Sequence, residues 1–136
     1  MKAENGKLIA IVRVRGKVNL NYNIEETMQR LNLKAVNNCS LIRLTDSYKG
    51  MINRCQNHVA YGEIDEATLS KMLARHAPDA NAKEVMEGKL DSIKEGMPIR
   101  LHPPRRGYRK IKQSFNQGGQ LGYMGGEINK LIGRMI

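Results

Sequence analysis

The densest chemical signal in the sequence lies between residues 100 and 112, where six Lys or Arg residues and one His occur without an acid. Prolines and a glycine interrupt this stretch, so it is predicted to be a loop or hairpin and not a helix. Each cation that meets a phosphate releases condensed counterions, and an aromatic ring or a guanidinium plane can stack on an unpaired base. A solvated loop usually mixes charge signs, and this one does not, so the pattern favours contact with nucleic acid. The residues predicted to make that contact are Arg100, His102, Arg105, Arg106, Tyr108, Arg109, Lys110 and Lys112.

Other residues capable of chemistry give weaker signals. The glycines between residues 118 and 126 lack the Gly-Lys-Ser/Thr ending of a nucleotide-binding loop, so they are predicted to allow a close approach of the backbone to RNA or to another segment. Cys55 and His58 have the spacing of one zinc-ligand pair, but a structural site needs a second pair. Core cysteines are the better interpretation, and we expect neither a metal nor a cofactor.

The acids Glu63, Asp65 and Glu66 could act as general acids or bases. Acids at the start of a helix are, however, expected from the helix dipole and from capping alone. No Ser-His-Asp or Cys-His arrangement is legible in the sequence either, although such a triad is defined by geometry and not by sequence order. The sequence therefore favours a binding protein over an enzyme.

Three segments predict the strands that must position the cations: residues 8–15, which are rich in β-branched residues, 39–44 and 59–64. The first has one wholly apolar parity, whereas its other parity ends in Arg13 and Arg15. In the second, Arg43 takes the parity opposite Ile42 and Leu44. Helices are therefore expected to cover the apolar face of the sheet and to leave a cationic face free. The predicted RNA-binding residues of that face are Arg13, Arg15 and Arg43, with Lys17, Lys49 and Arg54 nearby.

Apolar residues at helical spacing predict a helix after each strand. Asn23 is the expected N-cap of the first helix, in a capping-box arrangement. Asp46 or Ser47 is the expected cap of the second, and Asp65 caps the third, which Pro78 ends. These elements predict the order β-α-β-α-β-α over the first 77 residues.

The last part of the chain is predicted to be less regular. Residues 79–96 are polar and helix-tolerant, which indicates a short surface helix. A proline-, arginine- and glycine-rich stretch follows. The final apolar stripe predicts a docked C-terminal helix through Ile128, Leu131, Ile132 and Met135.

Composition and charge limit the class of protein. The chain has 136 residues, which fits one domain, and a formal net charge of +10, which implies a polyanionic partner such as nucleic acid or an acidic membrane surface. Two basic regions, residues 1–55 and 97–136, flank an acidic middle. No apolar stretch approaches the length of a membrane helix, there is no signal peptide at the N-terminus, and two cysteines form no disulfide framework. We expect a soluble, cytoplasmic protein.

Two separate groups of motifs resemble the archaeal large-subunit ribosomal protein family that is numbered thirty in bacteria and archaea and seven in eukaryotes. The segments LIAIVRVRG, IEETMQRLNL and GMINRCQNHVAYGEID resemble the core shared by all branches, and RLHPPRRGY and FNQGGQLGYMGGEINKLI resemble the archaeal and eukaryotic extension. The first strand begins soon after the N-terminus, without the long basic extension of eukaryotic members, which favours the archaeal branch. Thr45-Asp46-Ser47 stands where the family commonly has Thr-Pro, so the start of the second helix is expected to be looser.

This resemblance implies an α+β fold with a three-stranded sheet in order 3-1-2 and helices packed on one face. The chain is expected to form a single domain, with residues 1–64 as a β-α-β-α-β core and residues 65–136 as a C-terminal helical and loop extension. The resemblance also implies a structural protein without catalytic residues, cofactor, metal or small-molecule substrate. Its expected partners are large-subunit rRNA and neighbouring large-subunit proteins, with the protein a monomer within the ribosome.

Three alternatives stay open at this stage. A free-standing regulatory or ribosome-assembly RNA-binding protein would carry the same charge but would not co-purify stoichiometrically with large subunits. An RNA-acting enzyme would lose turnover on mutation of Glu63 or His102. A membrane-surface protein would carry its basic residues on an amphipathic helix, whereas the densest cluster here lies in a predicted loop.

Overall fold

The computed structural model describes residues 8–16, 21–31, 33–76, 98–105, 107–108, 110–114 and 117–135. Its elements are β1 (Leu8–Arg13), α1 (Tyr22–Arg30), β2 (Asn38–Arg43), α2 (Asp46–Cys55), β3 (Val59–Glu63), α3 (Glu66–His76), β4 (Pro98–Arg100), β5 (Lys110–Ser114), β6 (Gly119–Tyr123), the 3-10 turn η2 (Gly125–Glu127) and α5 (Ile128–Met135). The predicted order β-α-β-α-β-α is confirmed. The predicted surface helix over residues 79–96, and Pro78 before it, lie outside the described residues.

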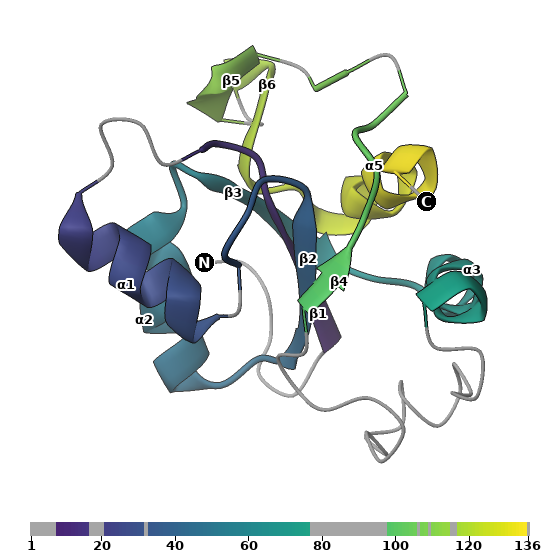
Figure 1. Cartoon of the computed structure of the whole chain (residues 1–136), viewed down its shortest axis with the longest axis horizontal. Helices are drawn as coiled ribbons and strands as arrows, with labels where there is room; N and C mark the ends of the chain where they lie inside the picture. The colour runs from purple at the N-terminus through teal and green to yellow at the C-terminus, as the bar shows by residue number, and fades with distance from the viewer. Residues whose placement is uncertain are drawn as a thin grey trace.

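Six strands form the sheet, in the order β4-β2-β1-β3-β6-β5 (Figure 1). The central order β2-β1-β3 is the predicted 3-1-2, and both of its pairings are antiparallel. The prediction of only three strands is wrong, because β4 pairs with β2 and β6 pairs with β3, and β5 then pairs with β6. A strand edge presents unpaired N–H and C=O groups. Here the C-terminal extension supplies the strands that pair with both edges of the central three.

Helices cover both faces of the sheet, so their predicted packing on one face is wrong. Figure 1 shows α1 and α2 on one side of the central strands and α3 and α5 on the other. Ile9 and Ile11 of β1 pack in the core with α1 and α2, whereas Leu8, Ala10 and Val12 pack in the core with α3 and α5. A strand that is buried on both faces has apolar residues on both parities. All six residues of β1 are buried.

Side chains cap the N-termini of α1, α2 and α3, but the caps of α1 and α2 lie at other positions than predicted. Asn21 caps α1, since its Oδ1 accepts a hydrogen bond from the backbone N–H of Asn23 at 2.9 Å. Thr45 caps α2 by accepting from the backbone N–H of Tyr48 at 3.3 Å. The predictions of Asn23 for α1 and of Asp46 or Ser47 for α2 are therefore wrong by one or two residues.

The cap of α3 is confirmed, because Asp65 Oδ1 accepts from the backbone N–H of Thr68 at 2.8 Å.

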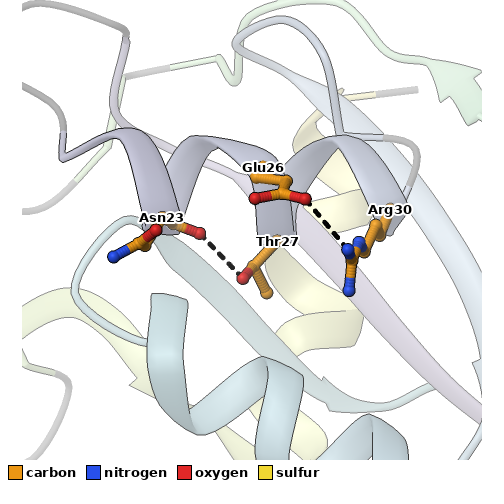
Figure 2. Close-up of polar contacts among 4 residues, drawn as sticks. All are labelled: Asn23, Glu26, Thr27 and Arg30. Atoms are coloured by element: carbon orange, nitrogen blue, oxygen red, sulfur yellow. Dashed lines mark hydrogen bonds and ion pairs between the residues drawn. The ribbon is translucent and has the colours of Figure 1, made fainter.

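Two polar contacts lie within α1, one at the buried Thr27 and one between exposed side chains. Figure 2 shows the Thr27 hydroxyl donating to the Asn23 carbonyl oxygen at 2.9 Å, and an ion pair of 2.9 Å between Arg30 and Glu26 one turn apart. Both side chains of this ion pair are largely exposed, so it contributes only about 0.3–0.5 kcal/mol. Next to Thr27, Met28 is fully buried against the sheet. Burial of these residues, and not the ion pair, holds α1 in place.

The predicted C-terminal helix is confirmed as α5, whose four stripe residues are all buried. Burial of one aliphatic side chain stabilises a fold by about 1.5–3 kcal/mol, so this stripe is a major attachment of the extension to the core. The helix lies close to β3 at Gly62, where an added Cβ would overlap the carbonyl oxygen of Gly125 and lie 2.9 Å from Ile128 Cγ2. Gly62 therefore permits the close approach of the extension to the central sheet.

Candidate nucleic-acid interface

The described part of the basic segment runs from β4 to β5. Its middle, residues 101–105 and 107–108, is a loop, which confirms that part of the prediction, while its two ends are strands. Leu101 and Pro104 are buried, whereas Arg100, His102 and Arg105 are exposed. Apolar residues thus attach the loop to the core, and basic side chains remain in solvent. Arg106 and Arg109, and the side chains of Lys110 and Lys112, lie outside what the structure describes.

The loop is hydrogen-bonded to the C-terminal end of α5. The backbone N–H of His102 donates to the Met135 carbonyl at 2.9 Å, and that of Arg105 donates to the Arg134 carbonyl at 3.1 Å. In the other direction, Arg134 Nη1 donates to the carbonyl oxygens of Arg105 at 3.3 Å and Gly107 at 3.2 Å. The last carbonyls of a helix have no partner within the helix. Here the backbone N–H groups of the basic loop are the hydrogen-bond donors to two of these carbonyls.

Tyr108 attaches the end of the loop to the turn that precedes β2. Its hydroxyl donates to Asn37 Oδ1 at 2.6 Å, and its half-buried ring packs against the core that contains α3 and α5. Burial raises the pKa of the phenol well above its ordinary value, so the hydroxyl remains a donor at neutral pH. This packing gives Tyr108 an attachment role, in place of a free ring on which bases could stack.

Arg13 lies inside the protein and not on a free cationic face, so its predicted placement is wrong. Its side chain is 1% exposed; Nη1 donates to the Leu33 carbonyl at 2.8 Å and Nε to the Arg15 carbonyl at 3.0 Å. Burial lowers the pKa of the guanidinium from its ordinary value. Arg13 is therefore a structural cation that binds backbone carbonyls.

Arg13 and Arg43 also lie on opposite faces of the sheet. Directly opposed residues of an antiparallel pair share a face. Arg13 is opposite Val59, which packs with α1 and α2, whereas Arg43 is opposite Leu8, which packs with α3 and α5. Ile42 and Leu44 belong to the same core as Val59. The predicted shared face of Arg13, Arg15 and Arg43 is therefore wrong.

The other predicted cations of the core region are spread over several elements. Arg15 is half-buried and donates to the Asn57 carbonyl at 3.4 Å. Arg43 is half-buried in β2, and α2 carries a half-buried Lys49 and an exposed Arg54. Lys17 lies outside the described residues. Arg43 lies opposite Leu8 at the start of β1, whereas Arg15 follows the end of β1, so these two cations do not form one compact site.

The described residues contain no group of three or more His, Cys, Asp or Glu side chains that could hold a metal ion. Cys39 and Cys55 are buried free thiols, as the sequence predicted. Burial raises the pKa of Cys39 to about 12 and that of Cys55 to about 11, so both are protonated at neutral pH. A protonated, buried thiol is a poor nucleophile and a poor metal ligand. Among the described helices, none combines the length and the apolar character needed to cross a membrane.

Two residues that shape the basic loop had not been predicted from the sequence. Arg134 lies in the last turn of α5, a position where a cation commonly contacts terminal carbonyls, so the C-terminal helix pattern could have indicated it. Asn37 has a left-handed φ of 70°, and no motif in the sequence links it to Tyr108. Its contact depends on two segments that lie 71 residues apart in the chain.

The fold and the site together define a class: a small, basic α+β protein that displays cations on a loop fixed to its C-terminal helix. The family model for ribosomal protein L30p/L7e matches residues 9–59, from β1 to the start of β3. The large ribosomal subunit protein uL30 of Methanoculleus marisnigri is 38% identical, over 94% of this chain and 99% of the relative. That of Methanococcus vannielii is 39% identical over 93% and 98%, and that of Korarchaeum cryptofilum 40% identical over 95% of each. The chain belongs to the ribosomal protein L30p/L7e family.

Proposed function

We propose that this protein is a structural constituent of the large ribosomal subunit that binds and stabilises large-subunit rRNA during translation. The observation that carries the proposal is the match to archaeal relatives over nearly the full length of both chains; these relatives are named large ribosomal subunit proteins. As a member of this family, the protein is a non-enzymatic component of the ribosome in the cytoplasm. The formal net charge of +10 supports rRNA as the partner.

We infer that the RNA contacts come from two groups of cations. The first group belongs to the basic segment: Arg100, His102, Arg105, Arg106, Arg109, Lys110 and Lys112. The second belongs to the central strands, their following loops and α2: Arg15, Lys17, Arg43, Lys49 and Arg54. The exposure of Arg100, His102 and Arg105 supports the first group. Arg13 is left out because it is buried, and Tyr108 is assigned to attachment of the loop.

The proposal extends to assembly. We propose one domain, with residues 1–64 as the core and residues 65–136 as the extension, which the pairing of β6 with β3 and the burial of α5 support. Neighbouring large-subunit proteins are the further partners, and the protein is a monomer within the ribosome. Sedimentation with large subunits through a high-salt sucrose gradient tests this. Occurrence only in the free pool would instead favour the free-standing regulatory protein.

The salt dependence of RNA binding tests the first group of cations. The triple variant Arg105→Ala, Arg106→Ala, Arg109→Ala is titrated with in-vitro transcripts that together cover large-subunit rRNA. The slope of log K against log salt is negative, and each lost phosphate contact reduces its magnitude by about 0.7–0.9. The triple variant is therefore expected to reduce the magnitude of the slope by about 2–3. The charge-matched control is the triple variant Arg30→Ala, Lys71→Ala, Lys130→Ala, which removes exposed cations from the helices α1, α3 and α5. An unchanged slope in the first triple variant would remove the segment from the interface.

A further inference from the structure

We propose that Arg134 is a positioning residue for RNA binding, which fixes the loop backbone at Arg105 and Gly107 so that His102 and Arg105 are held in one arrangement before RNA arrives. The inference rests on the proposed function. It assigns to Arg134 a role that acts through the protein's own carbonyl groups and not through a phosphate.

The hydrogen bonds of Arg134 support this role. Nη1 contacts two carbonyl oxygens of the loop, those of Arg105 and Gly107, at 3.3 and 3.2 Å. Both carbonyls belong to a tight turn in which the Gly107 N–H donates to the Pro104 carbonyl at 3.0 Å and Gly107 has a left-handed φ of 73°. A guanidinium is planar and weakly hydrated, which suits contact with several carbonyl oxygens, whereas the shorter ammonium of lysine is strongly hydrated. The side chain thus adds two hydrogen bonds to a turn that already has one backbone hydrogen bond of its own.

The loop is also fixed at both ends to Asn37. The backbone N–H of Leu101 donates to the Asn37 carbonyl at 3.3 Å, and the Tyr108 hydroxyl donates to Asn37 Oδ1 at 2.6 Å. Between these two points the loop donates to the end of α5 and accepts from Arg134. Its contacts therefore come from two elements, β2 with its preceding turn and α5, that the rest of the fold holds in place.

Prior fixation of the loop strengthens RNA binding for an entropic reason. Fixing the backbone of one residue costs a free energy equivalent to about a tenfold change in an equilibrium constant. When internal hydrogen bonds already order the loop in the free protein, RNA binding does not have to offset the entropy lost by ordering it. A variant that loosens the loop by about one residue's worth of freedom should therefore bind about tenfold more weakly, with the same number of phosphate contacts.

The test compares Arg134→Gln, Arg134→Lys and Tyr108→Phe in the full chain. The matched control is Lys130→Gln, which removes one exposed charge from the same helix. Amide exchange of Arg105 is measured in the free protein, and Kd is measured against salt with the large-subunit rRNA transcripts. We expect faster exchange and about tenfold weaker binding in both Arg134 variants, with the salt slope unchanged. Tyr108→Phe should act in the same direction without changing any charge, and Lys130→Gln should leave the exchange unchanged.

Three outcomes would overturn the inference. If Arg134→Gln reduced the magnitude of the salt slope by about 0.7–0.9 and Arg134→Lys restored both slope and affinity, Arg134 would contact a phosphate directly. Faster exchange with unchanged affinity would give Arg134 a purely structural role. Unchanged exchange would mean that it does not fix the loop. Absence of salt-dependent binding by the unaltered protein would instead overturn the proposed function, so the two failures are distinguishable.

Discussion

The end of β1 and the loop of residues 101–108 both carry arginines, and the fold uses them in opposite ways. At the end of β1 the guanidinium of Arg13 is buried and donates to the carbonyls of Leu33 and Arg15. In the loop, Arg105 is exposed and its carbonyl accepts from Arg134. At the end of β1, Arg13 itself holds the backbone. In the loop, Arg134 of α5 holds the backbone, and the side chain of Arg105 remains in solvent. A count of basic residues therefore overstates the number that can meet RNA.

Both regions place a guanidinium beside the C-terminal end of a helix. Leu33, whose carbonyl accepts from Arg13, follows α1 and itself donates to the Met28 carbonyl at 2.9 Å. Arg134 lies in the last turn of α5. The C-terminal end of a helix carries a partial negative charge and unpaired carbonyls, so a cation is favoured there. The difference is the depth of the guanidinium: the Arg13 side chain is fully buried, whereas Arg134 is half-buried.

The largest effect is expected for Arg13→Ala, which tests whether the end of β1 is structural. The substitution leaves a cavity and removes both donors from the Leu33 and Arg15 carbonyls, so the free energy of unfolding should fall by about 3 kcal/mol. Urea denaturation measures this change. The salt slope of RNA binding should stay as in the unaltered protein, because a buried cation releases no counterions.

The control for this prediction is Arg15→Ala at the same end of the strand. Arg15 is half-buried and makes one long hydrogen bond of 3.4 Å, so its loss should cost less than about 1 kcal/mol. If Arg13→Ala lowered the salt slope at unchanged stability, the two regions would not differ in the way described.

A smaller effect is expected for Gly62→Ala, which loosens the second region by acting on its support. The added Cβ would overlap the Gly125 carbonyl oxygen and crowd Ile128 at the start of α5, so the free energy of unfolding should fall by about 2 kcal/mol. Because α5 holds the loop, hydrogen exchange should quicken more at Arg105 than around Arg13.

Gly133→Ala is the control within α5. An added Cβ at Gly133 would meet no atom within 4 Å, so alanine should stabilise the helix by about 0.5–1 kcal/mol. If Gly62→Ala accelerated hydrogen exchange equally at Arg105 and around Arg13, the extension and the core would loosen together.

Local sequence patterns predicted the elements well and the cationic face badly, for physical reasons. The stripe of α5 and the Asp65 cap depend on residues within one or two turns, and both were confirmed. The order of the three central strands agrees with what the family resemblance implied. Residues 98–100, for which no strand was predicted, form an edge strand because they pair with the open edge of β2. Such a pairing is not visible in either segment alone.

The error about Arg13 has a specific origin. Strand parity identifies which residues share a face, but it does not show whether that face is covered. Ile9 and Ile11 on the parity of Arg13 were a sign that it would be buried, and the two arginines that follow them obscured it. The roles of Arg134 and Asn37 were beyond prediction for a different reason: each depends on contacts between segments that only the folded chain brings together.

The smallest effect is expected in the pH dependence of stability, where His58 reports on the buried region. Burial, followed by the nearby positive charges of Arg15 and Arg13, lowers the pKa of His58 below its ordinary value of 6.5. The folded state therefore favours the neutral ring, and the unfolded state binds the proton first as pH falls. This contribution of the neutral His58 ring to stability is present above pH 6.5 and is lost as the pH falls through the lowered pKa of the folded state.

In His58→Gln, the free energy of unfolding should consequently fall less between pH 7 and pH 5 in urea titrations. A fall in His58→Gln identical to that of the unaltered protein would mean that the end of β1 is open enough for water to solvate the charged ring.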